Sequence, residues 1–402
     1  QKIQSEHIKE RISQFDGKLY LELGGKLFDD HHASRVLPGF MPDSKLRMFQ
    51  KISDSIEIVI VISATDIEKN KKRADLGITY DEDVLRLRGE FQNRGFMVGS
   101  VVITHYNGQP AAIAFRQRLE RDGIKTYCHY LIEGYPHNVA LIASDEGFGK
   151  NDYVETERPL VIVTAPGPGS GKMAVCLSQL YNENKRGVRA GYAKFETFPV
   201  WNLPLKHPVN IAYEAATADL NDVNMIDPFH LEAYNKIAIN YNRDIEIFPV
   251  LNALFEGIYG SNPYKSPTDM GVNMVGFCIS DDEACCEASK NEIVRRYYAA
   301  TNKLACGACN ESEISKIQML FNQAKITTDF RRCTVAAKNF KKETGHTSSA
   351  IELEDGTIIT AKSSELLGCS AALLLNVMKH LAGIDHNIKL IPQSMIEPIQ
   401  HT

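Results

Sequence analysis

The sequence predicts an α/β protein with a mostly parallel sheet, flanking helices, a helical subdomain and a small α+β segment. Three observations predict this class. Short β-branched runs alternate with segments of helical periodicity in the N-terminal half, a Gly-rich loop follows one of these runs, and residues 281–341 have helical periodicity almost throughout. Strands that alternate with helices pair in parallel, because the helix carries the chain back across the sheet.

In chain order, a polar amphipathic helix is expected at residues 1–14. Strands are expected at residues 18–23, 58–62, 98–104, 126–130, 139–143, 159–164 and 189–195. Helices are expected between them at residues 42–53, 83–92, 109–121 and 171–183. The strands follow from their apolar or β-branched composition and the helices from apolar residues spaced three and four apart.

Beyond residue 208 the pattern becomes mainly helical, with helices expected at residues 209–220, 228–236 and 245–259. The pair Asp355-Gly356 then predicts a hairpin between residues 349–353 and 357–360, since glycine supplies the positive φ of the turn. A long apolar helix is expected at residues 364–382. The resulting organisation has four regions, residues 1–155, 156–270, 271–345 and 346–402.

Composition excludes several classes of protein. With 402 residues, 44% apolar and 24% charged, the chain has ordinary globular composition, and its net charge of −5 excludes a strongly basic protein that coats nucleic acid. No apolar run approaches the ~20 residues of a membrane span, and no signal-peptide pattern opens the chain. We therefore expect a cytoplasmic protein with no nucleic-acid or membrane partner, and a homo-oligomer, the commonest assembly of such proteins.

The nine cysteines are expected to be reduced thiols. Their number is odd, and a secreted disulfide scaffold would be shorter and richer in cysteine. Cys306 and Cys309 form a CxxC motif, but no second CxxC or His pair follows at zinc-site spacing. A turn between helices is therefore favoured over a metal or redox site, and no metal ligands are assigned.

The strongest chemical motif is a P-loop-like strand–loop–helix unit at residues 160–175. Its loop directs backbone N–H groups to a helix N-terminus that favours an anion, and a lysine adds a positive charge. The phosphate-binding candidates are Gly167, Gly169, Ser170, Gly171 and Lys172.

Two positions depart from the P-loop pattern. Pro166 replaces its first glycine, and Met173 replaces the Ser or Thr that holds Mg²⁺. The departures weaken the prediction of a magnesium–nucleotide site more than that of a phosphate site. A purely structural turn is the alternative.

A second polar cluster follows the first strand, where ligands of open α/β sheets collect. Asp29, Asp30 and His31, together with His105 after a later strand, are candidates for acid–base catalysis or Mg²⁺ binding. Lys26 and Arg35 are candidates for holding a phosphate or carboxylate. The alternative is a solvated turn in which an aspartate caps a helix.

Other polar segments supply weaker ligand-contact candidates. They are Asp145 in a Gly-broken loop, Lys194 and Glu196 near the only Trp, and Asp227 and His230 further on. Asp227 followed by Pro228 is also a typical helix start, so structure explains part of that acidity. The cationic run at residues 69–73 is expected to be a solvated face.

Five segments together resemble a large bacterial family of conserved hypothetical proteins, an uncharacterised family built on a domain of unknown function. They lie at residues 24–30, 33–40, 75–81, 165–173 and 224–230. The resemblance covers essentially the whole chain and implies a multidomain α/β protein with a helical subdomain. It implies no reaction. Because family members extend further at both ends, this chain is expected to be truncated.

The function expected from these motifs is an enzyme that acts on a phosphorylated or nucleotide ligand, by phosphoryl transfer or ATP-dependent ligation. The sequence does not determine the cofactor, for which ATP or GTP with Mg²⁺ is a candidate, and a small phosphorylated molecule is the expected partner. The alternative is a non-catalytic protein that binds or senses a phosphate or sugar phosphate. The reaction and the substrate do not follow from the sequence.

Overall fold

The computed structural model describes residues 1–25, 27–28, 30–73, 76–390 and 394–395. It divides into two compact units, Gln1–Ser289 and Lys290–Thr402.

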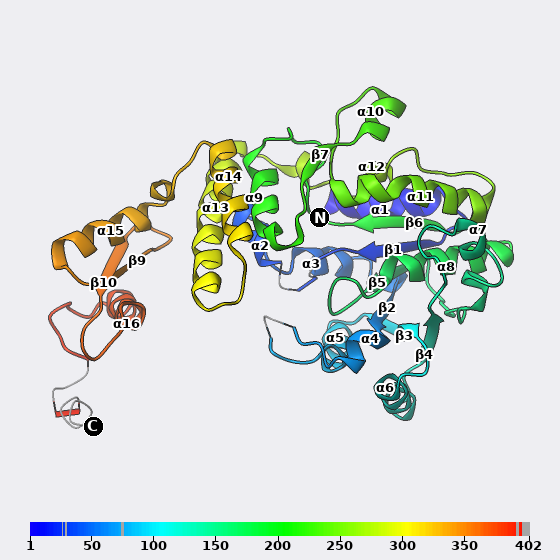
Figure 1. Cartoon of the computed structure of the whole chain (residues 1–402), viewed down its shortest axis with the longest axis horizontal. Coiled ribbons are helices and arrows are strands. Elements are labelled where there is room, and N and C mark those ends of the chain that lie inside the picture. The colour runs from blue at the N-terminus through cyan, green and yellow to red at the C-terminus, as the bar shows by residue number, and fades with distance from the viewer. Residues whose placement is uncertain (26, 29, 74–75, 391–393, 396–402) are drawn as a thin grey trace. The chain divides into compact units, whose positions relative to one another are not determined.

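The first unit is built on a six-stranded parallel sheet (Figure 1). Its strands are β1 (Leu19–Leu23), β2 (Ile56–Ser63), β3 (Met97–Tyr106), β4 (Thr126–Tyr130), β5 (Leu160–Thr164) and β6 (Gly191–Phe195), in the order β4-β3-β2-β5-β1-β6. All pairs are parallel; Leu160 of β5 lies opposite Leu19 of β1 and Ile56 of β2. β1, β2 and β5 are buried along their whole length, which explains their largely apolar sequence.

Helices cover both faces of this sheet. One face packs against α1 (Lys2–Ser13), α3 (Ser44–Gln50), α5 (Tyr80–Asn93) and α6 (Pro110–Arg121). The opposite face packs against α8 (Lys172–Lys185) and α11 (Asn242–Tyr259). Alternate strand residues supply the two cores, with Leu21 on the first face and Tyr20 on the second. The predicted α/β class with a parallel sheet is therefore confirmed.

The connections of β1 and β5 leave these neighbouring strands in opposite directions. From β1 the chain passes through α2 (His31–Val36) and α3 to β2, which lies beyond β5. From β5 it passes through α8, on the other face, to β6 beyond β1. Such a topological switch point leaves a crevice at the carboxyl ends of the two strands.

Shorter elements complete the first unit. They are α4 (Ala64–Glu68), α7 (Val139–Ile142), α9 (Pro208–Ala216), β7 (Asn224–Ile226), α10 (Pro228–Tyr234), β8 (Ile239–Tyr241) and α12 (Pro267–Met270). β7 and β8 pair antiparallel, a ribbon that the sequence analysis did not predict. The strand predicted at residues 139–143 is wrong: the Asn138 side chain accepts the Leu141 N–H and caps the helical turn α7 instead.

The second unit contains most of α13 (Asp282–Ala305), then α14 (Glu311–Ala324) and α15 (Arg332–Thr344). The predicted hairpin is confirmed as β9 (Ser348–Glu352) paired antiparallel with β10 (Ile358–Lys362), and Gly356 in its turn has a φ of +81°. α16 (Cys369–Leu381) packs on β10, where the Asn376 amide donates to the Thr360 carbonyl.

None of the nine cysteines, all of which the structure describes, forms a disulfide bond. Among the described residues, no helix combines the length and the apolarity that a bilayer crossing requires.

The pH dependence of stability is expected to reflect His129 in β4. Its ring is buried, with Nε2 3.1 Å from the Asp152 carbonyl oxygen, and burial lowers its pKa from 6.5 to about 4. Between pH 6.5 and pH 4, His129 is protonated in the unfolded chain and neutral in the folded chain. The free energy of unfolding therefore falls as the pH falls. The expected loss is roughly 3 kcal/mol, complete near pH 4.

Chemical denaturation of the wild type and of His129→Gln between pH 7.5 and 4 measures this loss. Glutamine keeps a side-chain N–H donor but does not titrate, so the variant should lose stability less steeply. Parallel curves for the two proteins would contradict the assignment.

Candidate functional site

A cavity of about 530 Å³ opens at the carboxyl ends of β1, β5 and β6, where the switch point predicts a crevice. Its walls come from the ends of these strands, the Gly-rich loop, α5, the β8–α11 junction and the segment after α9. Its size is that of an ordinary small-molecule pocket.

The Gly-rich loop forms one wall of this cavity. Gly167, Gly169 and Lys172 line it. Gly169 and Gly171 have φ angles of +75° and +87°, which other residues adopt at a cost. Gly167 packs so closely on Tyr80 that a Cβ would lie 2.3 Å from its hydroxyl oxygen. The loop conformation therefore requires its glycines.

Ser170 and Gly171 shape the loop rather than line the cavity. The buried Ser170 hydroxyl donates to the Gly167 carbonyl at 2.9 Å, and the Ser170 carbonyl accepts from the Thr104 hydroxyl at 2.7 Å. These bonds hold the loop against the end of β3.

Lys172 is the first residue of α8, where the helix dipole already favours an anion. Within the described part of the chain, its ammonium group has no hydrogen-bond or ion-pair partner.

Two arginines beside the loop share one carboxylate. Asp83 of α5 is fully buried and accepts from Arg73 Nη1 at 3.0 Å and from Arg86 Nε at 2.7 Å. Both arginines line the cavity. The Nη2 atom of Arg86 is buried without a hydrogen-bond partner among the described residues. This guanidinium group, which lines the cavity, can therefore donate a hydrogen bond to a ligand.

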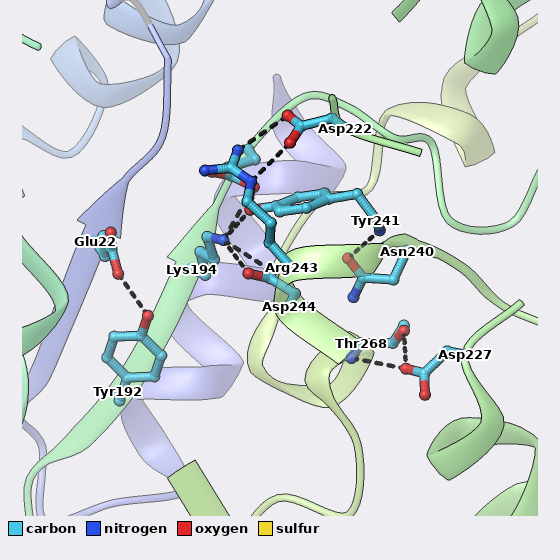
Figure 2. Close-up of polar contacts among 11 residues, drawn as sticks. Glu22, Tyr192, Lys194, Asp222, Asp227, Asn240, Tyr241, Arg243, Asp244 and Thr268 are labelled. Atoms are coloured by element: carbon cyan, nitrogen blue, oxygen red, sulfur yellow. Dashed lines mark hydrogen bonds and ion pairs between the residues drawn. The ribbon is translucent and has the colours of Figure 1, made fainter. Parts of the chain in front are cut away.

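On the far wall, Lys194 of β6 forms the centre of a largely buried polar network, in which the Glu196 side chain is 27% exposed (Figure 2). Its Nζ lies 2.8 Å from both carboxylate oxygens of Asp244 and 3.3 Å from Glu196, and donates to the Tyr241 hydroxyl. The Tyr241 hydroxyl in turn donates to Glu196 at 2.8 Å. Gly24 allows this arrangement, because a Cβ there would lie 2.0 Å from Glu196 Cγ.

The network shifts the titration of its members. Burial alone would lower the pKa of Lys194, but the Asp244 and Glu196 carboxylates raise it above its ordinary value. Burial raises the pKa of Glu196, and the nearby Lys194 charge opposes this only in part. Glu196 is thus a carboxyl group in a cavity that holds its proton more tightly than usual, as acid–base catalysts do.

Two further carboxylates line the same cavity. Glu22 of β1 accepts from the Tyr192 hydroxyl at 2.6 Å, and Asp222 accepts from Arg243 Nε and Nη2 at 2.7 and 2.9 Å (Figure 2). The cavity therefore has a cationic side near the Gly-rich loop and a side on which carboxylates alternate with Lys194 and Arg243.

The sequence-derived acid–base candidates do not meet at the cavity. Asp30 caps α2 through the Ala33 N–H and pairs with Lys45 at 2.7 Å; burial opposes its charge, but Lys45 outweighs this and lowers the pKa of Asp30. His31 is exposed at the start of α2, and Arg35 is exposed near its end. His105, at the end of β3, lies with Nδ1 3.0 Å from the Ser63 hydroxyl. Asp29 and Lys26 lie outside the described residues.

The other ligand-contact candidates divide into two groups. Lys194 and Glu196 line the cavity, as just described. Asp145 lies on the surface, paired with Lys185. Asp227 caps α10 and accepts from the Thr268 hydroxyl at 2.6 Å, and the His230 ring lies 3.0 Å from the Ser266 hydroxyl.

Sequence reasoning missed several residues of the cavity wall. Arg73 belongs to a run of charged residues that was expected to be solvated, and no local pattern indicated a role for Arg86 or Asp222. A charged residue inside an otherwise apolar strand, as Glu22 is, was the one available signal.

Replacing Lys194 by Met is expected to destabilise the protein by about 3 kcal/mol, because the buried Asp244 carboxylate and the partly buried Glu196 carboxylate would lose their cation. Adding Asp244→Asn should recover part of this loss. Denaturant unfolding at pH 7 measures both, with Lys185→Met on the exposed end of α8 as the matched control. A loss no larger than that of the control would contradict the network's role.

Comparison with known proteins places the chain in a family. Residues 1–325 match the domain of unknown function DUF1846, N-terminal, and residues 329–402 match its C-terminal counterpart. The UPF0371 protein of Corynebacterium urealyticum is 59% identical over 399 residues, covering 99% of this chain and 80% of the relative. UPF0371 proteins of Streptococcus thermophilus and Streptococcus pyogenes are 58% and 57% identical over 398 residues, covering 99% of this chain and 81% of each relative. The resemblance predicted from the five segments is confirmed, and the chain belongs to the uncharacterised bacterial family UPF0371, built on the DUF1846 domains.

Proposed function

We propose that the cavity binds a small phosphorylated metabolite rich in hydroxyl groups, such as a sugar phosphate, and that the protein is an enzyme that acts on it. One observation carries this proposal: a Gly-rich loop, several cations and the partly buried network of Lys194 and Glu196 all line one cavity at the switch point.

The phosphate is assigned to the cationic side. Lys172 offers an ammonium group without a partner among the described residues, and Arg86 offers an unsatisfied Nη2 donor. A phosphate accepts hydrogen bonds from both types of group and gains from the dipole of α8. The same groups would bind a carboxylate more weakly, since it has fewer oxygens and less charge.

The rest of the ligand is assigned to the carboxylate-rich side. Glu22 and Asp244 accept hydrogen bonds, which suits the hydroxyl groups of a sugar or polyol. Glu196, whose pKa is raised by burial, is the proposed general acid or base. The Tyr241 hydroxyl, 2.8 Å from Glu196, holds its carboxylate in place.

Two features favour a phosphate monoester over a magnesium-bound nucleoside triphosphate. Met173 provides no oxygen for Mg²⁺, and the Ser170 hydroxyl is already committed to the Gly167 carbonyl. ATP and GTP with Mg²⁺, the candidate cofactors that the loop motif suggests, therefore serve as the second arm of the test.

The test is thermal unfolding of the full chain against sugar phosphates, inorganic phosphate, ATP and GTP, each with and without Mg²⁺. A ligand at ~100 times its Kd should add ~2.7 kcal/mol of stability. Lys172→Ala should abolish this shift, whereas Lys185→Ala, at the other end of α8, should preserve it. Equal shifts in both variants, or no shift with any phosphate, would overturn the assignment of the cavity.

Turnover distinguishes an enzyme from a sensor. Once a stabilising ligand is found, Glu196→Gln should bind it with an affinity near that of the wild type and fail to convert it. Mass spectrometry of the ligand after incubation with the wild type detects any chemical change. A ligand that binds but remains unchanged would support the non-catalytic alternative instead.

A further inference from the structure

A second cluster of reactive side chains lies outside the cavity. It contains His207, just before α9, and Asp282 and Cys286 in the first turns of α13, all within the first unit. The His207 ring is 9% exposed, and the Asp282 side chain is 63% exposed. None of the three residues lines the 530 Å³ cavity, so this cluster is independent of the proposed function.

We propose that His207, Asp282 and Cys286 bind a divalent transition-metal ion, Zn²⁺ being the best fit. Imidazole nitrogen, thiolate sulfur and carboxylate oxygen are the ligand types that zinc prefers, and three protein ligands leave its fourth tetrahedral position open. The exposed side of Asp282 allows water to reach that position.

The separations of the three groups suit one ion. His207 Nε2 lies 3.0 Å from Asp282 Oδ1 and 3.5 Å from Cys286 Sγ, and Cys286 Sγ lies 3.8 Å from Asp282 Oδ2. Ligands at the usual zinc distances around a tetrahedral centre are separated by about 3.3–3.6 Å. With one ligand atom taken from each residue, all three atoms lie within 4.8 Å of one another, so an ion fits among them after side-chain shifts on the order of an ångström.

Local structure presents these groups together. Asp282 and Cys286 are four residues apart in α13, so they project from the same side of the helix. His207 ends a tight turn, its N–H bonded to the Pro204 carbonyl, that leads into α9. The adjacent Cys285 lines a different cavity of about 430 Å³, which makes it a natural control.

Zinc binding would change the protonation of two ligands. The Cys286 thiol must lose its proton, and the ring proton of His207 must sit on Nδ1 when the ion occupies Nε2. In the structure His207 Nδ1 accepts the Val209 N–H at a long 3.3 Å. A proton on Nδ1 would remove this acceptor, so zinc binding at Nε2 would cost the helix one weak capping hydrogen bond. Metal affinity should accordingly fall as the pH is lowered.

The experiment is a Co²⁺ titration of the chelator-treated full chain under reducing conditions, followed by Zn²⁺ competition. One Co²⁺ per chain should give the visible spectrum of a tetrahedral site and a thiolate-to-cobalt charge-transfer band. Cys286→Ser should abolish the charge-transfer band, while Cys285→Ser should keep it. Asp282→Asn, an exposed and conservative change, should weaken Co²⁺ binding by more than ~10-fold, with unfolding of the metal-free protein unchanged.

Three results would overturn the proposal. They are the absence of saturable Co²⁺ binding, a charge-transfer band that persists in Cys286→Ser, and a band that disappears only when Cys306 and Cys309 are both changed to Ser. The last result would assign the ion to the CxxC motif.

Discussion

β5 pairs with β1 on one side and with β2 on the other, and this placement determines where the molecule can bind a ligand. The connection from β1 crosses β5 to reach β2, and the connection from β5 crosses β1 on the other face of the sheet to reach β6, so a crevice opens between the two connections at the strand ends. The Gly-rich loop starts at that edge, and so do Gly24 and Gly25 after β1. Helices bury both faces of the central strands, which leaves the strand ends as the place for polar groups.

Several of the charged groups at this edge are held in place by partners. Asp83 holds two arginines, Asp222 holds Arg243 through two bonds, and Asp244 holds Lys194. Ordered side chains lose little further entropy when a ligand binds, so an arrangement of this kind favours recognition of one charge pattern. Removing these charges from water is costly, and the burial that imposes this cost is also what raises the pKa of Glu196.

Much of the fold could be predicted because its signals are local. The β-branched runs of β2, β3 and β5 and the Asp355-Gly356 turn each indicate one structure. The errors lie where a segment is too short for its own pattern to decide. Four apolar residues suit a strand or a helical turn equally, and the Asn138 cap decides for α7. β7 and β8 have three residues each and form only because the chain brings them side by side.

The candidate site could be predicted only in part, for a related reason. Lys172 and Lys194 were found because each belongs to a conspicuous segment beside a strand end. Arg86 was missed because its place in the cavity depends on Asp83, three residues earlier in α5, and on the approach of α5 to the loop through Tyr80 and Gly167. Conversely, the CxxC motif attracted attention through its spacing alone, while His207 and Cys286 are separated by 79 residues and meet only in the folded chain. The spacing of residues in a sequence identifies a site when one helix or loop carries all of its ligands. Here both sites take their side chains from elements that are distant in the sequence. The fold therefore determines which residues can act together.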